Sequence, residues 1–342
     1  MLRKISDSVV VITGASSGIG RATALQIAKK KGTLVLAARQ EEALQDAAEE
    51  CGRLGARVLA IETDVTDEGQ VQNLAQRAVE TFGRIDAWVN DAAVTMLARF
   101  EQSPSDSFRR VIETNFFGYV HGARAVLPQF RAQGYGVLVN VASILGKAGA
   151  PYSSAYVASK FAITGFSESL RMELLDARQI HVCTILPATI DTPLFQKAAN
   201  YTGRVVQPPP PVYPPEEVAA AIVRCLTHPK REVPVGNAGR MNSMRTMAPA
   251  LAERIIARKI DRQHLGDKSA PPSDGNLFQP LAEFHSVHGG WLNGHGKKPK
   301  GFLAAALLLA GAGAASYFSY RRRQQPVLRR LSERLLPNSL VP

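Results

Sequence analysis

Three side chains suited to proton transfer lie close together near the middle of the chain. Ser143 follows a short apolar run, Tyr156 comes 13 residues later, and Lys160 lies four positions beyond the tyrosine. Positions i and i+4 of a helix project from the same face, so we expect the phenol and the ammonium to be neighbours. A nearby cation stabilises a phenolate, which should lower the pKa of the tyrosine towards neutral pH.

This trio suits the reduction of a carbonyl or the oxidation of an alcohol. When a hydride adds to a carbonyl, the developing alkoxide needs a proton, which Tyr156 can supply as acid/base. Ser143 can orient the substrate oxygen and share its developing charge. Asn115, on a predicted helix beside the site, is expected to hold a water that relays the proton. The sequence thus predicts a catalytic group of Asn115, Ser143, Tyr156 and Lys160.

A glycine-rich turn near the start of the chain predicts a nucleotide site. The run Thr13-Gly14-Ala15-Ser16-Ser17-Gly18-Ile19-Gly20 follows a predicted strand and opens a predicted helix. Glycines let the backbone approach a pyrophosphate, and the helix N-terminus offers free N–H groups and a positive dipole end. The expected cofactor contacts are Gly14, Ser16, Ser17, Gly18, Ile19 and Gly20.

Arg39 ends the second predicted strand, where a dinucleotide-binding protein contacts the adenosine ribose. An acidic residue there favours NAD, whereas an arginine can pair with a 2′-phosphate and favours NADP. The sequence therefore predicts NADP(H) as cofactor. Asp64 and Val65, after the third strand, are expected at the adenine edge, and Asn90, after the fourth, on the adenosine side.

The elements that must position these residues predict an α/β fold. Short β-branched runs alternate with longer segments of helical periodicity, which is typical of a parallel sheet covered on both faces. Right-handed crossovers make such a seven-stranded sheet doubly wound, of Rossmann type. The predicted strands are residues 9–13, 33–37, 58–62, 87–90, 136–141, 181–186 and 232–235, and predicted helices include 21–30, 41–54, 70–82 and 104–127. We assign residues 1–240 to this domain.

A proline-rich segment, residues 194–217, follows the sixth strand and cannot form a helix or a central strand. We interpret it as a lid or substrate loop, with a plain surface connector as the alternative. Leu194 and Phe195 in this loop, and Met96, Leu97 and Phe100 in an earlier one, favour a small hydrophobic substrate, such as a lipid, steroid or ketone.

Residues 241–300 are expected to form a helical and irregular linker. Residues 247–260 have the pattern of an amphipathic helix, and 266–300 are loop-like or disordered in composition. His285, His288 and His295 fall in this part, but no cysteine or acidic cluster accompanies them, so we predict surface histidines and no metal site.

The uncharged segment 302–320 predicts a membrane-associated helix within residues 301–321, followed by a basic tail over 322–342. A helix of this length spans about 28 Å, close to the thickness of a bilayer core. Lysines precede the segment and Arg321, Arg322 and Arg323 follow it. We expect a membrane-associated protein whose catalytic domain faces the cytoplasm. The positive-inside rule would place the arginines on that same side, so a span and an interfacial helix both stay open.

Composition limits the other classes of partner. The net charge is +12, but residues 1–236 hold 25 Lys/Arg against 23 Asp/Glu, whereas residues 297–342 hold nine Lys/Arg against one Glu. A basic tail on a nearly neutral body does not predict a nucleic-acid partner. Cys51, Cys183 and Cys225 are scattered, which favours reduced thiols in a cytosolic setting.

In these motifs the chain resembles the short-chain dehydrogenase/reductase family, in its branch of roughly 250 residues. The resemblance covers residues 8–236 and lies in Thr13–Gly20, Asn90, Asn115, Ser143, Tyr156 and Lys160. It implies that Lys160 also binds the nicotinamide ribose and that Pro187, Ile190 and Thr192 flank the nicotinamide. It also implies a homodimer or homotetramer. The family's Asn-Asn-Ala-Gly and Pro-Gly read Asn90-Asp91-Ala92-Ala93 and Pro187-Ala188 here, and we expect these small replacements to preserve cofactor binding.

Two other functions are compatible with the same fold. A non-enzymatic NADP-binding sensor or scaffold would not need Tyr156 and Lys160 together. A lyase or epimerase would keep both residues but would be expected in a longer chain with a sugar-nucleotide domain. We therefore favour an NADP(H)-dependent oxidoreductase acting on CH–OH groups.

Overall fold

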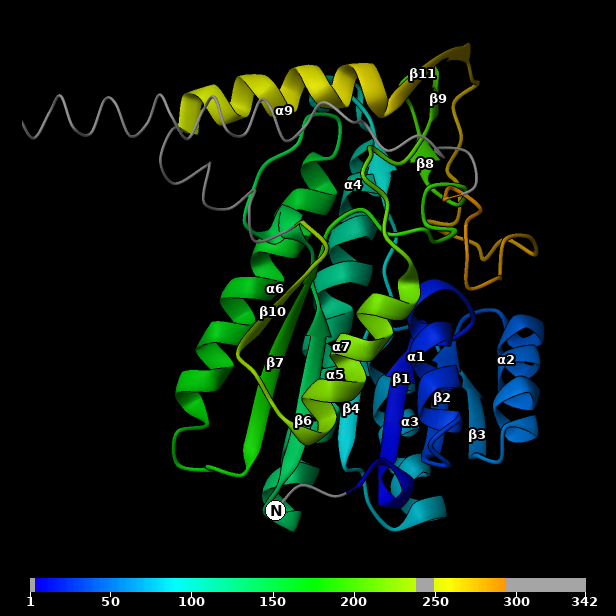
Figure 1. Cartoon of the computed structure of the whole chain (residues 1–342), viewed down its shortest axis with the longest axis vertical. Coiled ribbons are helices and arrows are strands. Elements are labelled where there is room, and N and C mark those ends of the chain that lie inside the picture. Colours follow the sequence, from blue (N-terminus) through cyan, green and yellow to red (C-terminus); the bar gives the residue numbers. More distant parts are fainter. Residues whose placement is uncertain (1–3, 238–248, 293–342) are drawn as a thin grey trace, which may run out of the picture. The chain divides into compact units, whose positions relative to one another are not determined.

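A computed structural model describes residues 4–237 and 249–292 of the chain (Figure 1). Its centre is a seven-stranded parallel sheet in the order β10-β7-β6-β4-β1-β2-β3. The strands are β1 Val9–Thr13, β2 Thr33–Ala38, β3 Arg57–Glu62, β4 Ala87–Asn90, β6 Gly136–Val141, β7 Ile180–Pro187 and β10 Glu232–Val235. The predicted seven-stranded Rossmann-type sheet is confirmed.

Alternation along the strands builds two hydrophobic cores, one on each face of the sheet. In β1, Val10 and Ile12 belong to one core and Val9 and Val11 to the other. All four are buried, as expected for a parallel sheet covered on both sides. Because neither face of β1 meets water, its sequence is a continuous apolar run rather than an alternating one.

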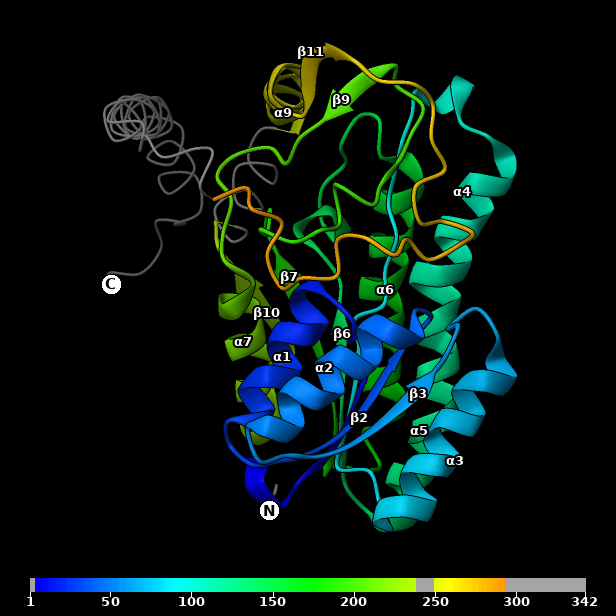
Figure 2. The same cartoon turned by 90° about the vertical axis from the view of Figure 1, so that its right-hand side faces the viewer.

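Helices cover both faces. On one face α1, α2 and α7 pack together, and α3, α5 and α6 cover the other (Figure 2). Their bounds are α1 Gly18–Ala28, α2 Glu41–Arg53, α3 Glu68–Phe82, α4 Ser105–Ile112, α5 Gly118–Gln133, α6 Ser154–Glu173, α7 Pro215–Thr227 and α9 Pro249–Gln263. The two-sided cover brings the carboxyl ends of β1, β4, β6 and β7 to one edge, where doubly wound sheets bind ligands.

The helix predicted over 104–127 is present as one helical run with a π-turn inside it. The run consists of α4, a π-helical turn over Glu113–Phe117, and then α5. A π-turn admits an extra residue within a helical run and is frequent at functional sites. Here it turns Asn115 inward, where its side chain is fully buried.

Short strands shape the chain above the sheet. They are β5 Met96–Leu97, β8 Ala199–Asn200, β9 Arg204–Val206 and β11 Leu265–Ser269, with β5 paired to β8 and β9 to β11. The proline-rich loop after β7 is thus tied to the body at β8 and β9. It ends at α7, whose first residue is Pro215, a favoured residue at the first helical position.

The C-terminal extension is less separate from the body than a linker would be. The amphipathic helix predicted over 247–260 is present as α9. Residues 270–292, which we call the strap, follow β11 and are loop-like, as their composition predicts, but they lie against the body (Figure 1). The Gly18 N–H donates to the Ser286 carbonyl at 3.1 Å, and Arg21 Nη1 donates to the His285 carbonyl at 3.0 Å. These hydrogen bonds to backbone carbonyls hold the strap in a defined position, although its composition predicts only an irregular loop.

The predicted membrane helix at 302–320 and the basic tail lie outside the described residues, as does His295. Over residues 4–237 and 249–292, no helix is both long enough and apolar enough to cross a membrane.

Candidate active site

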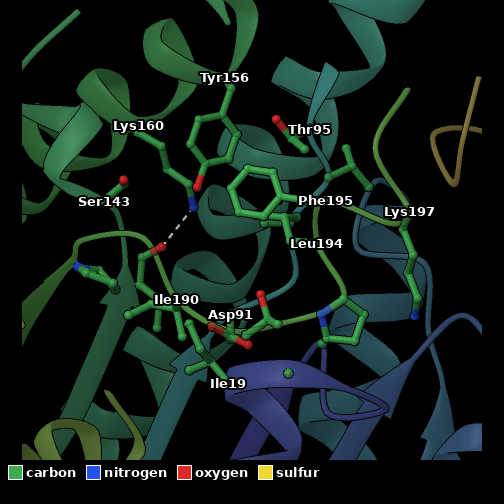
Figure 3. A pocket seen from close by; sticks show the side chains of 18 of the residues that line it. Ile19, Asp91, Thr95, Ser143, Tyr156, Lys160, Ile190, Leu194, Phe195 and Lys197 are labelled. Atoms are coloured by element: carbon green, nitrogen blue, oxygen red, sulfur yellow. Dashed lines mark hydrogen bonds between the residues drawn. The ribbon is translucent and has the colours of Figure 1, made fainter. Parts of the chain in front are cut away.

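One cavity of about 320 Å³ extends along the carboxyl edge of the sheet and contacts most of the predicted site residues. Those that line it are Gly14, Ser16, Ser17, Gly18, Ile19, Arg39, Val65, Ser143, Tyr156, Lys160, Pro187, Ile190 and Thr192. Tyr156, Lys160 and Ser143 lie together at one end, and Ile19, Asp91 and Ile190 lie nearer the glycine turn (Figure 3). The motifs that the sequence placed far apart therefore share one cavity.

The glycine turn has the backbone geometry that its sequence predicts. Gly14 and Gly18 adopt φ of +73° and +54°, a region that side chains disfavour. A Cβ on Gly14 would stand 2.8 Å from the backbone of Ala92, and one on Gly20 would stand 2.3 Å from the Gly14 carbonyl oxygen. The glycines thus bring the start of α1 against the β1 and β4 ends, which leaves its N-terminus facing the cavity.

Arg39 lies at the end of β2 and lines the cavity, where the sequence placed it. Its Nη1 donates to the Leu277 carbonyl at 3.1 Å and its Nη2 to the Asn276 carbonyl at 2.6 Å. Burial lowers the pKa of this guanidinium, and Asp64 opposes that effect. The strap therefore holds Arg39 in place, a contact that the sequence does not reveal because the partners lie more than two hundred residues away.

Tyr156 and Ser143 face each other across the cavity, from α6 and the end of β6. The Ser143 hydroxyl accepts from the Leu145 N–H at 3.1 Å. Burial raises the pKa of Tyr156 above its usual range, and the nearby Ser143 side chain only partly offsets this. The expected lowering of this pKa is therefore wrong for this structure, because desolvation of the phenolate outweighs the stabilising groups around it.

Lys160 follows Tyr156 by one helical turn and is only 2% exposed. Its Nζ donates to the Val141 carbonyl at 2.9 Å and lies 5.4 Å from the centre of the Tyr156 ring. Burial lowers the pKa of Lys160 to about 8, while the charge of Asp91 raises it. The i, i+4 spacing thus places the two side chains together as predicted.

Asp91, which the sequence indicates only as a small replacement, is a site residue. Its carboxylate lies against Gly20, and it lines the cavity. Burial raises the pKa of Asp91 to about 8, and the charge of Lys160 opposes this rise. The charges of Asp91 and Lys160 support each other, so the departure from the family motif introduces an acid that interacts with Lys160.

Asn115 lies behind the cavity wall rather than on it. Its Oδ1 accepts from the Val94 N–H at 2.8 Å, and its Nδ2 donates to the Val94 carbonyl at 2.9 Å and to Ser159 Oγ at 3.1 Å. These bonds use both Nδ2 hydrogens and one of the two Oδ1 lone pairs. The side chain fixes the loop that precedes β5 against α6.

Two predicted cofactor contacts do not line the cavity. Asn90 is 1% exposed; its Oδ1 accepts from Trp88 Nε1 at 2.8 Å and its Nδ2 donates to Asn140 Oδ1 at 2.9 Å, which joins β4 to β6. The carboxylate of Asp64 is paired with Arg110 at 2.6 Å. Internal partners thus use polar atoms of both side chains. Gly20 also lies behind the lining, where it supports the turn.

The end of the cavity beyond Tyr156 is walled by apolar side chains. Leu194 and Phe195 come from the proline-rich loop, and Ile256 and Ile260 from α9. His264, which follows α9, lies edge-on to the Phe195 ring, with ring centroids 5.4 Å apart. The contribution of α9 was not foreseen, since amphipathic periodicity shows that a helix has an apolar face but not what that face covers.

Comparisons with known proteins agree with this arrangement. A family model described as short chain dehydrogenase matches residues 8–202. The uncharacterized oxidoreductase YxnA of Bacillus subtilis (strain 168) is 36% identical over 322 residues, which cover 91% of this chain and 90% of that protein. Dehydrogenase/reductase SDR family member 7B of Bos taurus is 32% identical over 275 residues, which cover 76% of this chain and 83% of that protein.

Among solved structures, an alcohol dehydrogenase from the archaeon Thermococcus sibiricus, complexed with 5-hydroxy-NADP, matches with a TM-score of 0.58 and 27% identity. The match covers 67% of this chain and 94% of that one. The chain therefore belongs to the short-chain dehydrogenase/reductase family. It is an oxidoreductase of that type, and the family model ends well before α9 and the strap.

Proposed function

We propose that this protein is an NADP(H)-dependent oxidoreductase that interconverts a carbonyl and an alcohol on a small hydrophobic substrate. The observation that carries the proposal is the position of the Tyr156 hydroxyl. It faces Ser143, stands one turn from Lys160, and lines the same cavity as the glycine turn. A proton donor and a dinucleotide cradle in one cavity are the two parts that carbonyl reduction requires.

The cavity fits NADP(H) at its far end. Gly14, Gly18 and Ile19 form a backbone cradle at the start of α1, where the helix dipole would stabilise a pyrophosphate. The Gly18 N–H itself already donates to the Ser286 carbonyl of the strap. Arg39 supplies a cation where the ribose 2′-phosphate of this cofactor would lie. Pro187, Ile190 and Thr192 line the part between this cradle and Tyr156, and are proposed to flank the nicotinamide.

The chain's own residues manage the proton. When bound, the cofactor supplies or accepts the hydride. In reduction, the Ser143 hydroxyl positions the substrate oxygen and Tyr156 donates its proton to the alkoxide as it forms. The raised pKa of Tyr156 keeps the phenol protonated at neutral pH, which is the form that donates. Lys160 then stabilises the phenolate left behind, since a positively charged ammonium group close to the ring favours the ionised form.

The apolar end of the cavity supports a hydrophobic substrate. Leu145, Leu194 and Phe195 line the same cavity as Tyr156, together with Ile256 and Ile260 of α9. Apolar side chains with a few convergent polar groups are typical of sites for small organic ligands. Ser143 and Tyr156 provide the polar groups that would fix the reacting oxygen.

The deciding experiment measures NADPH oxidation against a panel of hydrophobic ketones and aldehydes, with Tyr156→Phe as the paired variant. The phenylalanine keeps the ring and removes the proton, so turnover should fall at least about a hundredfold while NADPH binding persists. Binding of NADPH with equal or absent turnover in both proteins would instead support a sensor or scaffold.

We further propose a homodimer or homotetramer formed through α5 and α6. Phe117, Phe161, Met172 and Leu175 are large apolar residues on or next to these helices and are 38–76% exposed. Exposed apolar patches of this kind mark association surfaces. A monomer in sedimentation velocity at micromolar concentration would contradict this assembly.

For residues 302–320 we propose attachment to a membrane, with the catalytic body on the cytoplasmic side. The support is the uncharged sequence between basic clusters. Deletion of residues 297–342 should move the protein from the membrane fraction to the soluble fraction, and a full-length protein that is already soluble would contradict the attachment.

A further inference from the structure

Lys197 is a buried cation at the end of the cavity opposite Tyr156 (Figure 3). It lies between β7 and β8 and is 9% exposed. Its Nζ reaches the glycine turn, where it donates to Ser17 Oγ at 3.4 Å. A lysine in the proline-rich loop thus points away from the substrate end and towards the dinucleotide cradle.

A second cation, Arg39, lines the same cavity. The charge of Arg39 and the burial of the site together lower the pKa of Lys197 to about 8, with burial the larger cause. Within the described part of the chain, no carboxylate lies within ion-pair distance of Lys197 or Arg39. The nearest acid acting on Arg39 is Asp64, and that carboxylate is already paired with Arg110.

The strap contacts both residues through Asn276, at the backbone of Lys197 and at the guanidinium of Arg39. The Asn276 N–H donates to the Lys197 carbonyl at 2.9 Å, and the Asn276 carbonyl accepts from Arg39 Nη2 at 2.6 Å. Two like charges held together at a buried site are unfavourable unless an anion joins them. The structure therefore maintains a charge arrangement that a bound anion would complete.

We infer that Lys197 is a second phosphate-binding residue, which acts with Arg39 on the 2′-phosphate of NADP(H) and so determines the preference for this cofactor. The inference rests on the proposed function. With Asp64 and Arg110 cancelling each other, Arg39 and Lys197 leave two positive charges, and a phosphate monoester carries about −1.5 to −2 near neutral pH. Arg39 ends β2, beside the expected ribose, so the 2′-phosphate fits better than the pyrophosphate.

The test compares the binding of NADPH and NADH, by isothermal titration, to the full-length protein and to Lys197→Gln. Loss of one charged contact should weaken NADPH roughly 10- to 100-fold, and NADH should stay within about twofold. Lys197→Arg should keep most of the preference for NADPH. Lys30→Ala removes an exposed lysine at the far end of α1 and should behave as wild type. If Lys197→Gln fails to fold, Lys197→Met, which retains the apolar stem, replaces it.

Two results would overturn the inference. One is an unchanged affinity for NADPH in Lys197→Gln, and the other is an equal loss for both cofactors, which would place Lys197 at the pyrophosphate or in the fold alone. A competition experiment tests the same contact independently. In the wild type, 2′,5′-ADP should displace NADPH and 5′-AMP should not, and this difference should be lost in Lys197→Gln. A wild-type protein that binds neither dinucleotide would instead remove the proposed function itself.

Discussion

The two ends of the cavity each hold a buried lysine, and burial lowers the pKa of both to about 8. Lys160 is compensated within the protein, since its Nζ bonds the Val141 carbonyl and Asp91 supplies an opposing charge. Lys197 instead meets a hydroxyl and a second cation. A lowered pKa alone therefore does not assign a role to either lysine. The charges around the lysine distinguish a proton-handling group from one that binds an anion.

The largest effect should come from Lys160. Lys160→Met removes the cation beside Tyr156 and leaves Asp91 without its partner, so kcat/KM should fall about 10²- to 10⁴-fold. Lys197→Gln should act mainly on the KM for NADPH. Steady-state kinetics with saturating and limiting NADPH separates the two. If Lys197→Gln depressed kcat as strongly as Lys160→Met, the proposed division of roles would be wrong.

Raising the pH should weaken the preference for NADPH. The Lys197 ammonium binds the phosphate below its pKa of about 8, and the neutral amine above that pH does not, so the ratio of NADPH to NADH affinity should fall about tenfold between pH 7 and 9. The 2′-phosphate is already ionised over this range. Arg39 and Asp64, which face the same site, should keep their charges. Lys197→Arg should show a flat ratio, and a flat ratio in the wild type would count against the assignment.

Removal of Asp91 should alter the other end of the cavity only. In Asp91→Asn the carboxylate that raises the pKa of Lys160 is lost, so Lys160 should lose its proton at a lower pH. The charge of Asp91 also raises the pKa of Tyr119 and of Tyr156. The alkaline fall of kcat in reduction should move to lower pH, while the NADPH-to-NADH ratio stays constant. A profile that moves upwards, or a changed ratio, would contradict the separation of the two ends.

The smallest effect is expected at the end of the strap. The Trp291 N–H donates to Asp191 Oδ1 at 2.7 Å, and Trp291 Nε1 donates to the Thr192 carbonyl at 3.2 Å. Trp291→Ala should loosen the strap and weaken NADPH a fewfold, as expected from the loss of one or two ordinary hydrogen bonds. The neighbouring Leu292→Ala, at an exposed position, is the matched control. Identical NADPH affinities in both variants would show that the strap does not support this end of the cavity.

Local patterns predicted most of the fold and the end of the cavity that holds Tyr156 and Lys160. The seven strands are apolar runs, the glycine turn needs positive φ, and Tyr156 and Lys160 are one helical turn apart. Each of these signals lies within a few neighbouring residues. The order of the strands followed from general rules on crossovers rather than from any single residue.

The charged end could not be predicted in the same way. Lys197, Asn276 and Arg39 come from three distant parts of the chain, and only the folded backbone brings them together. Asn90 and Asp64 illustrate the opposite error: their polar side chains follow strands at the expected edge, but Asn140 and Arg110 use those atoms inside the protein. A sequence shows which groups are polar, whereas only the structure shows which of them are already satisfied.

The position of the strap late in the chain affects the order in which the site is completed during synthesis. Ribosomes add about 5–20 residues per second, and domains fold as they emerge, so the glycine turn and Arg39 are made long before Asn276 and Trp291. Until those last residues appear, the Gly18 N–H, Arg21 and Arg39 lack the carbonyls that meet them in the finished chain. A nascent chain, or one terminated before the strap, would thus carry the sheet and Tyr156 without the contacts that hold Arg39 and the glycine turn. Retention of the proposed cofactor would then require that synthesis has passed the strap.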